Sequence, residues 1–394
     1  WRKSLAKRLL ISGGTDTMEV VKLLRDKYEF IALYPPVAKH LQNLDIPCQL
    51  MGEKTDEVKV VAVNYAAYAM ANLLAKAQSV SSDLGDKRAV IFLNNLPSLL
   101  YDNLLNISMV INLLDKLNVD GAILHNDVEV ITRTVALWCK GHGKLCLHIP
   151  HAIYLDMDRG APGTDVHDLV TASHMVVGGS YQREWYEARG FKSENIKETG
   201  VPRFDRLSYN ILNKEHTCKL LGVNPSKPIV AYFSSWRQDT NLLGCHDGVE
   251  ESYTNFLTVA KSMSGIEYII KTHPSGRNRD WHAKKADEMG VRCVVVEQYL
   301  DVVLQAMTCG ISYGPSNVVL EAAILNKPTI SINGFKSDPE IITIEPDIES
   351  IKKAMISSIV GSPPPMQRFL TKYVGMPDGK ATARVAKYVE EVFA

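Results

Sequence analysis

Residues 266–281 read IEYIIKTHPSGRNRDW, and residues 309–333 read CGISYGPSNVVLEAAILNKPTISIN. Each stretch opens with a short apolar run that is typical of a buried strand, and the runs stop at a His-Pro and a Gly-Pro turn. Ser316 follows the second turn and is placed to cap a helix. Because anionic ligands collect where strands end and helices begin in parallel sheets, these two stretches predict a phosphate-binding site.

The predicted site has several polar groups. His273 directly follows its strand and can donate to a phosphate oxygen that gains charge as a bond breaks, although a core histidine is the alternative. Asn317 and Glu321 share one helix face, where a carboxylate can accept hydrogen bonds from ribose hydroxyls. Arg203 can contact a phosphate or pair with Asp205 at a domain junction. The remaining strand-end candidates for this site are Thr199, Gly200, Ser234, Ser235, Arg237, Pro315 and Ser316.

The rest of the chain alternates strand-like and helical runs, which indicates parallel α/β layers. The predicted strands of the first half are RLLIS, EFIALY, AVIFLN, GAILH, KLCLHI, MVVGGS and IKETGV, and those of the second half are PIVAYF, EYIIKT, RCVVVE, GISY, PTISI and ITIE. Helices are predicted near residues 17–27, 58–78, 99–117 and 128–140. A chain of 394 residues is long enough for two domains.

The first half has polar strand ends of its own. Gly13, Gly14 and Thr15 follow the opening strand, and the two glycines allow a ligand to approach the backbone, although an ordinary turn has the same pattern. Asp127 and His151 follow two later strands, and a carboxylate or an imidazole can remove a proton near neutral pH. Both also suit a structural role as polar caps. The histidine spacing lacks the HExxH pattern, so no metal site is predicted.

From about residue 121 onward the chain resembles the GT-B superfamily. The branch that it resembles contains CDP-glycerol glycerophosphotransferases, polysialyltransferase-like and capsule enzymes, and UDP-N-acetylglucosamine 2-epimerases. The segments that carry the resemblance are LCLHIPHA, VVGGSYQREWYEARGF, KETGVPRFDRL, PIVAYFSSWR, IIKTHPSGR, SYGPSNVVLEAAILNKPTI and YVGMPDGKATARVAKYV, in that order.

This resemblance implies an α/β protein with the GT-B fold, in which two Rossmann-like parallel-sheet domains face each other across a cleft. The implied domains are an acceptor-side domain over residues 1–205 and a nucleotide-donor domain over 206–365, with helices over 366–394 that cross back to the first domain. His151 occupies the place of the family's strand-end histidine, which makes it the first choice for a base, followed by Asp127. The turn from Gly13 to Thr15 would face the acceptor.

The predicted function is metal-independent transfer of a sugar from a UDP- or CDP-linked donor to a glycan, a polymer or modified DNA, with no cofactor required. Four alternatives remain open. They are a CDP-glycerol-type glycerophosphotransferase, a sugar-nucleotide 2-epimerase, a DNA-modifying glycosyltransferase, and a non-catalytic module that binds nucleotides or glycans. The 44 basic and 44 acidic residues cancel, which disfavours nucleic acid as the acceptor.

The compartment is predicted from the cysteines and the apolar runs. Seven cysteines, without a CxxC pair, are read as reduced core residues of a cytoplasmic protein. The N-terminal WRKSLAKRLLISGG lacks the apolar centre of a signal peptide, and no apolar run has the length of a transmembrane segment. We therefore expect an enzyme that meets its donor in the cytoplasm.

Overall fold

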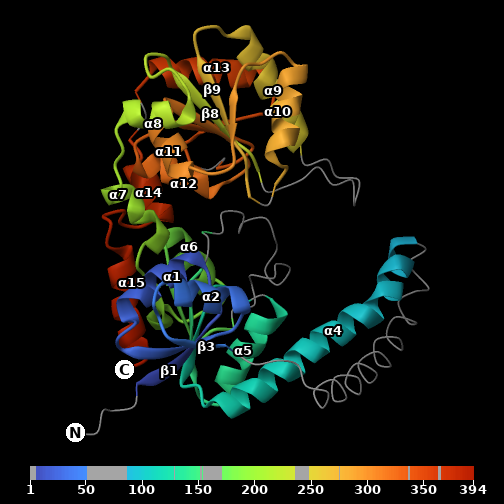
Figure 1. Ribbon diagram of the computed structural model, residues 1–394, viewed down its shortest axis with the longest axis vertical. Helices are drawn as coiled ribbons and strands as arrows, with labels where there is room; N and C mark the ends of the chain where they lie inside the picture. Colours follow the sequence, from blue (N-terminus) through green and yellow to red (C-terminus); the bar gives the residue numbers. More distant parts are fainter. Residues whose placement is uncertain are drawn as a thin grey trace.

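A computed structural model describes residues 6–50, 87–127, 129–150, 153, 171–235, 248–274, 276–335, 338–362 and 365–394. The described chain forms two parallel sheets, each with helices packed around it, and they lie one above the other in Figure 1. Successive parts of the chain build the two sheets. The predicted pair of Rossmann-like parallel-sheet domains is therefore confirmed.

The first sheet has seven described strands in the order β3-β2-β1-β4-β5-β6-β7. Their bounds are β1 Lys7–Ile11, β2 Tyr28–Ala32, β3 Cys48–Leu50, β4 Gly121–Leu124, β5 Leu145–His148, β6 His174–Val177 and β7 Ile196–Glu198. Every described pairing is parallel; β1, for example, aligns Leu10 with Ile31 of β2 and with Ala122 of β4. Since parallel strands share one direction, their carboxyl ends meet at one edge of the sheet.

The second sheet has six described strands in the order β10-β9-β8-β11-β12-β13. Their bounds are β8 Ile229–Phe233, β9 Glu267–Lys271, β10 Val294–Val296, β11 Cys309–Tyr313, β12 Thr329–Ile332 and β13 Ile342–Ile344. All six coincide with the apolar runs predicted as strands in the second half. Burial explains this success, because β8 is buried along its whole length and β12 likewise.

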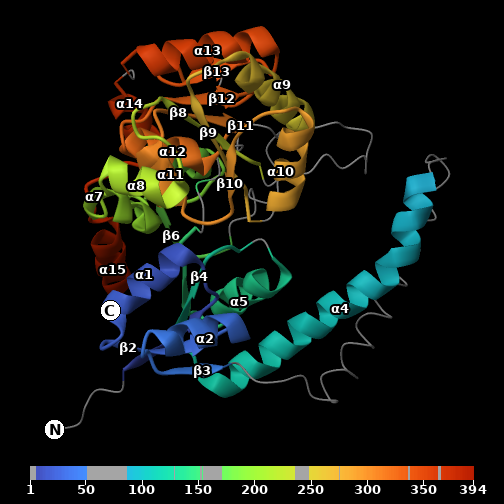
Figure 2. The ribbon, with the colours of Figure 1, turned by 45° about the horizontal axis from the view of Figure 1, so that its top comes forward.

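Helices connect the strands and cover both sheets, as Figure 2 shows from a second direction. Their bounds in the first domain are α1 Thr15–Leu24, α2 Pro35–Asn43, α4 Lys87–Leu117, α5 Val130–Gly141, α6 Ser180–Glu187, η3 Ser193–Asn195 and η4 Pro202–Phe204. Later in the chain follow α7 Arg206–Tyr209, α8 Lys214–Leu221, α9 Val249–Ser262, α10 Arg279–Glu288, α11 Leu300–Ala306, α12 Asn317–Ile324, α13 Ile348–Val360, α14 Gln367–Tyr373 and α15 Ala381–Val392. None of these helices combines the length and the hydropathy that a bilayer-spanning segment needs.

One predicted strand is wrong. AVIFLN, residues 89–94, lies inside the 31-residue helix α4, whose far end projects away from the body of the molecule in Figures 1 and 2. A short apolar run cannot by itself distinguish a strand from part of a helix, which explains the error. The edge strand β3 was missed because it has only three residues. The predicted helix over residues 58–78 lies outside the described residues.

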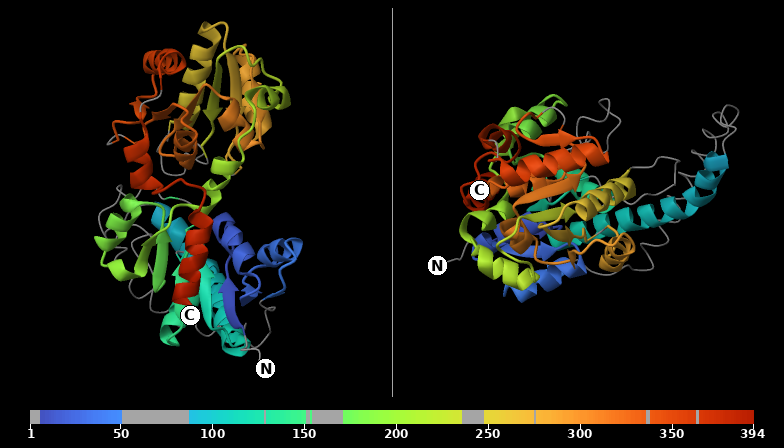
Figure 3. Two further views of the ribbon diagram at one scale, coloured as in Figure 1. Left: turned by 90° about the vertical axis from the view of Figure 1, so that its left-hand side faces the viewer. Right: turned by 90° about the horizontal axis from the view of Figure 1, so that it is seen from above.

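The last helix returns to the first domain. Figure 3 shows α15 running beside the first sheet, while α13 and α14 lie on the side of the second sheet. Val385 and Val389 of α15 are fully buried in the same apolar cluster as Val20 and Val21 of α1. The division at residues 205 and 365 stays a prediction, but α15 is packed on the first domain.

The two domains also share one buried apolar cluster. It includes Val177, Tyr181, Val201 and Phe204 from the first domain with Val303, Val319, Phe335 and Tyr373 from later in the chain. At Gly179 the backbones touch, since an added Cβ would lie 2.6 Å from the carbonyl oxygens of Thr371 and Lys372. The rings of Tyr181 and Tyr373 are 4.8 Å apart beside this contact. This shared core lies at the boundary between the two domains, and we call that boundary the seam.

Candidate functional site

Two strand ends of the second sheet meet beside His273. The Ser234 N–H, just after β8, donates to the Lys271 carbonyl at the end of β9 at 2.9 Å. Gly276 closes the His273 turn by donating to the His273 carbonyl at 3.0 Å. A Cβ added at Gly276 would collide with the Ser235 carbonyl oxygen, so only glycine permits this approach. Ser234, Ser235 and His273 are therefore brought together, while their predicted contact with a donor stays a prediction.

The start of α12 forms the neighbouring part of this edge. Ser316 caps the helix as predicted, with its hydroxyl accepting from the Val318 N–H at 3.4 Å, and the first turn contains no acidic residue. The preceding Gly314 has a φ of 71°, a backbone conformation that favours glycine. A Cβ on Gly334 would lie 2.6 Å from Pro315 N, so this second glycine lets the turn sit against the β12 end. The remaining helix-start N–H groups can bind an anion.

The surroundings of His273 favour its neutral form. Burial lowers its pKa, and the nearby Lys271 charge lowers it further. Lys271 is itself buried and donates to the carbonyls of Thr272 at 2.6 Å and Glu297 at 2.9 Å, and burial lowers its pKa as well. A neutral imidazole can still donate one hydrogen bond to a phosphate oxygen. The site thus offers neutral hydrogen-bond donors and the start of α12, and the Lys271 charge acts on His273.

Asn317 has its side chain turned to the first domain. Its Oδ1 accepts from the Ile153 N–H at 3.2 Å and from the Arg203 guanidinium at 3.1 Å, and its Nδ2 donates to the Ile153 carbonyl at 3.1 Å. The sequence predicted Asn317 as a donor-binding residue. In the structure its side chain is hydrogen-bonded to Ile153 and Arg203 of the first domain.

Glu321 is held beside the seam by Arg206, the first residue of α7. Its Oε2 pairs with the Arg206 guanidinium at 2.9 Å, and Arg206 in turn binds Asp301 through contacts of 2.8 to 3.0 Å. Burial raises the pKa of Glu321, while the Arg206 and Arg203 charges act in the opposite direction. A ribose hydroxyl would have to share this carboxylate with Arg206. The predicted ribose contact stays a prediction.

Asp16, which sequence reasoning missed, lies beside Arg203. Its Oδ1 accepts from the Arg203 backbone N–H at 2.7 Å, and its Oδ2 is buried without a hydrogen-bond partner. Burial raises the pKa of Asp16 to about 6, against the opposing effect of Arg203. The only sequence signal was an acidic residue in the first turn after the Gly13-Gly14 pair, which by itself reads as an ordinary helix start.

The other candidates of the first sheet have structural partners. Asp127 Oδ2 accepts from the backbone N–H groups of Thr171 at 2.6 Å and Ala172 at 3.2 Å, which fixes the entry to β6. Gly13 and Gly14 have φ of 108° and 91°, and no side chain caps the α1 helix that begins at Thr15. A catalytic role for Asp127 and an acceptor role for the glycine turn stay predictions.

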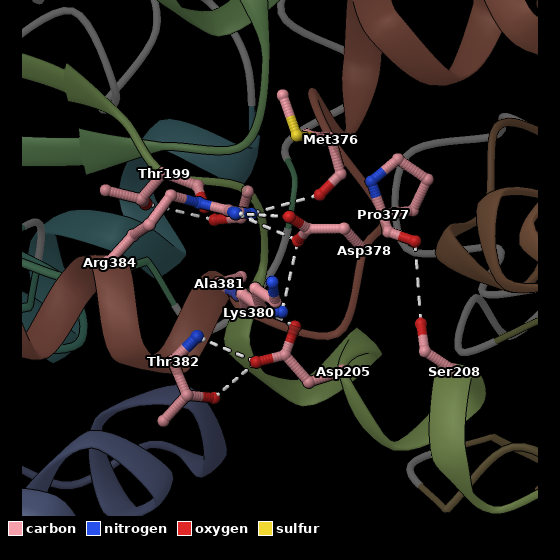
Figure 4. Close-up of polar contacts among 11 residues, drawn as sticks. Thr199, Asp205, Ser208, Met376, Pro377, Asp378, Lys380, Ala381, Thr382 and Arg384 are labelled. Carbon is pink, nitrogen blue, oxygen red and sulfur yellow. Dashed lines mark hydrogen bonds and ion pairs between the residues drawn. The ribbon is translucent and has the colours of Figure 1, made fainter.

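Thr199 and Gly200 lie against α15. The Arg384 guanidinium donates to the Thr199 carbonyl at 2.7 Å and forms two bonds of 2.8 and 2.9 Å with Asp378. A Cβ on Gly200 would lie 3.1 Å from Ala381 Cβ. Asp205 caps α15 by accepting from the N–H groups of Ala381 and Thr382 at 2.9 and 2.7 Å (Figure 4). These residues fasten the returning helix, and their predicted contact with a donor stays a prediction.

His151 and Arg237 lie outside the described residues. Within the described ranges, no three His, Cys, Asp or Glu side chains come together as a metal site would require. A small, mainly apolar cavity lies at the ends of β5, β6 and β7, lined by Ile149, Pro150, Ile153, Val176, Val177, Gly178, Gln182, Gly200, Val201 and Pro202. The cavity therefore lies beside Ile153, whose backbone is hydrogen-bonded to the Asn317 side chain.

The whole chain is similar in structure to known sugar-nucleotide enzymes. A UDP-N-acetylglucosamine 2-epimerase from Listeria monocytogenes, described as putative, matches with a TM-score of 0.62 and 13% identity over 98% of this chain and 97% of that chain. The Neisseria meningitidis UDP-GlcNAc 2-epimerase bound to UDP-GlcNAc matches with 0.59 and 13% over 98% and 100%. The S. aureus MnaA–UDP co-structure matches with 0.62 and 12% over 98% and 96%.

No protein-family model matches the chain, and no curated protein sequence matches it at a significant level. At identities of 12 to 13% the similarity concerns the fold. The chain therefore shares the GT-B-like arrangement of two Rossmann-like domains with these structures, the first two of which carry the name UDP-GlcNAc 2-epimerase.

Proposed function

We propose that this protein is an enzyme that acts on a UDP-linked sugar, and that it binds the UDP diphosphate at the start of α12. The observation that carries the proposal is that three neighbouring parallel strands of the second sheet, β9, β8 and β11, lead to His273, to Ser234 and to the α12 start. Backbone N–H groups, a hydroxyl and a neutral imidazole are the donors that a diphosphate needs. The whole-chain similarity to structures that contain UDP-GlcNAc or UDP supports the choice of nucleotide.

For the reaction we propose epimerisation at C2 of a UDP-N-acetylhexosamine, rather than the sugar transfer that the sequence favoured. Six of the similar structures are described as UDP-GlcNAc 2-epimerases, and the similarity covers 97 to 98% of this chain. Such a reaction needs one substrate, whereas transfer needs an acceptor as well. His273 and the α12 start would stabilise charge on the diphosphate as the substrate reacts.

The test uses UDP-GlcNAc in D2O without any acceptor. Loss of the C2 proton with breaking of the C1–O bond to UDP, followed by return of UDP to C1 and of a solvent deuteron to C2, would place deuterium at C2 and produce the 2-epimer, which NMR detects in one sample. His273→Ala, which lacks the proposed diphosphate donor, is expected to slow both changes equally. Full-length protein that binds UDP-GlcNAc but leaves its C2 hydrogen unexchanged would contradict epimerisation.

Transfer of a sugar or of an alditol phosphate is the second candidate. It is favoured by the run KETGVPRFDRL, which places Arg203 at the seam between the donor site and the first domain. A guanidinium there can bind a phosphorylated second substrate. Release of free UDP or CMP only when a glycan or polyol phosphate acceptor is added would identify transfer. The cytoplasmic location and the acceptor classes stay predictions.

A further inference from the structure

Asn317 is the first residue of α12, and its side chain connects that helix to two separate parts of the first domain. Ile153 belongs to the connection between β5 and β6, and Arg203 follows β7. The amide accepts two hydrogen bonds at 3.2 and 3.1 Å and donates one at 3.1 Å. Two of these bonds are to the Ile153 backbone, so a neutral side chain pairs with both the N–H and the carbonyl of one residue.

This arrangement is supported from the other side of the seam. Arg203 has its backbone N–H fixed by Asp16 at 2.7 Å, while its guanidinium reaches Asn317. Four residues further along α12, Glu321 pairs at 2.9 Å with Arg206, which follows the first domain directly in the chain. The α12 start is therefore tied to the first domain at the point where the proposed diphosphate site lies.

We propose that Asn317 is a positioning residue that fixes the α12 start against the first domain, so that a UDP-sugar spanning both domains meets a preassembled site. The inference rests on the proposed function for the identity of the ligand. Asn317 does not bind the donor in this account. Its amide holds Ile153 and Arg203 in place. It therefore does not change the affinity of a ligand that contacts only the second domain.

Two ligands distinguish this role from simple contact with the donor. UDP is bound by the second domain alone in this account, whereas UDP-GlcNAc also reaches the first domain with its sugar. Loss of the amide should leave the UDP affinity nearly unchanged and weaken UDP-GlcNAc binding about tenfold, because three hydrogen bonds that preassemble the site are lost. Damage to the diphosphate site itself would weaken both ligands to the same extent.

The experiment titrates UDP and UDP-GlcNAc into the full chain by calorimetry and follows amide hydrogen exchange at Ile153. Asn317→Ala is the main variant. Asn317→Asp keeps the acceptor oxygen but loses the donation to the Ile153 carbonyl, so an intermediate rise in Ile153 exchange is expected. Its added charge at the α12 start would weaken both ligands, so this variant is compared by exchange alone. Asn213→Ala is the control, because the Asn213 side chain caps a different helix, α8, by accepting from the Glu215 and His216 N–H groups.

In Asn317→Ala, exchange at the Ile153 N–H should rise about tenfold and only UDP-GlcNAc should bind more weakly, while Asn213→Ala should behave as wild type. Equal loss of UDP and UDP-GlcNAc affinity would overturn the positioning role. Unchanged exchange at Ile153 in both Asn317 variants would overturn it independently of any ligand. If wild-type protein binds neither ligand, the proposed function fails, and the exchange measurement alone decides the role of Asn317.

Discussion

Helices α1 and α12 each begin directly after a strand end, one in each domain, and their first turns differ in charge. α1 starts after Gly14 without a side-chain cap and carries Asp16, which is 0% exposed, in its first turn. α12 starts after Ser316, which caps it, and has no acid in its first turn. A carboxylate near the start of α1 complements the positive end of the helix and repels a phosphate, while the α12 end remains available.

The difference shows that a glycine-rich turn before a helix is not enough to identify a phosphate site. Gly13 and Gly14 both have positive φ before α1, yet the acid that follows them makes this helix start the poorer anion site. Burial holds the pKa of Asp16 at about 6, so the carboxyl is largely ionised at neutral pH. We therefore assign the proposed donor site to the second domain. Asp16 accepts a hydrogen bond from the Arg203 backbone at the seam.

The largest expected effect tests whether the donor site lies at the second sheet. His273→Ala should lower turnover of a UDP-sugar about a hundredfold to a thousandfold, because one donor to the developing charge is lost. Thermal unfolding should be unchanged within error. His216→Ala, on an exposed position of α8, is the matched control and should retain full turnover. Near-normal turnover in folded His273→Ala would remove this residue from the site.

The next effect concerns Asp16 and depends on pH. Its pKa is about 6 in the folded protein, and an Asp in an unfolded chain titrates near 3.8. Between these values the folded state binds more protons, so the free energy of unfolding falls as the pH rises, by about 3 kcal/mol once the pH exceeds 6.

Asp16→Asn removes that charge and is expected to be more stable than wild type at pH 7, with the gap closing toward pH 4. Denaturant unfolding at several pH values measures the difference. An equal difference at pH 4 and pH 7 would show that the Asp16 carboxyl does not titrate in this range and would contradict its raised pKa.

A smaller effect is expected when the α12 start is made to resemble that of α1. Ser316→Asp preserves a good helix cap but places a negative charge where the diphosphate should bind, so the UDP affinity should fall about tenfold without loss of stability. Asn213→Asp adds the same charge at the start of α8 and serves as the control. Equal UDP binding by both variants would argue against the α12 site.

The smallest effect is predicted for Glu321. Glu321→Gln keeps the shape of the side chain but removes its charge from Arg206, which still has Asp301 as a partner. We expect UDP to bind a few-fold more weakly, with little change in the rate of the chemical step. Calorimetry and kinetics on the same preparation separate the two quantities. Unchanged affinity would mean that Glu321 only pairs with Arg206.

Sequence reasoning recovered the local features and missed the distant ones. The six strands of the second sheet and the Ser316 cap follow from apolar runs and from residues a few positions apart. The partners of Asn317 and Glu321 lie 164 and 115 positions away, at Ile153 and Arg206, and no pattern within one segment reveals them.

The same limit explains the remaining differences. Asp127 was predicted from its position at a strand end, but its carboxylate holds backbone groups 44 and 45 residues later. Thr199 and Gly200 were predicted as donor contacts, and the last helix of the chain packs against them, which the sequence did not reveal. Chemical type and strand-end position indicate which residues can bind a ligand, whereas tertiary partners decide which are already occupied.

The most direct test of the account is the position of the diphosphate in crystals grown with UDP. The account predicts that the phosphates lie at the start of α12, within hydrogen-bond distance of the Ser316 hydroxyl and the first backbone N–H groups of the helix, with His273 beside them. Phosphates bound instead at Gly13 and Gly14, at the start of α1, would contradict it.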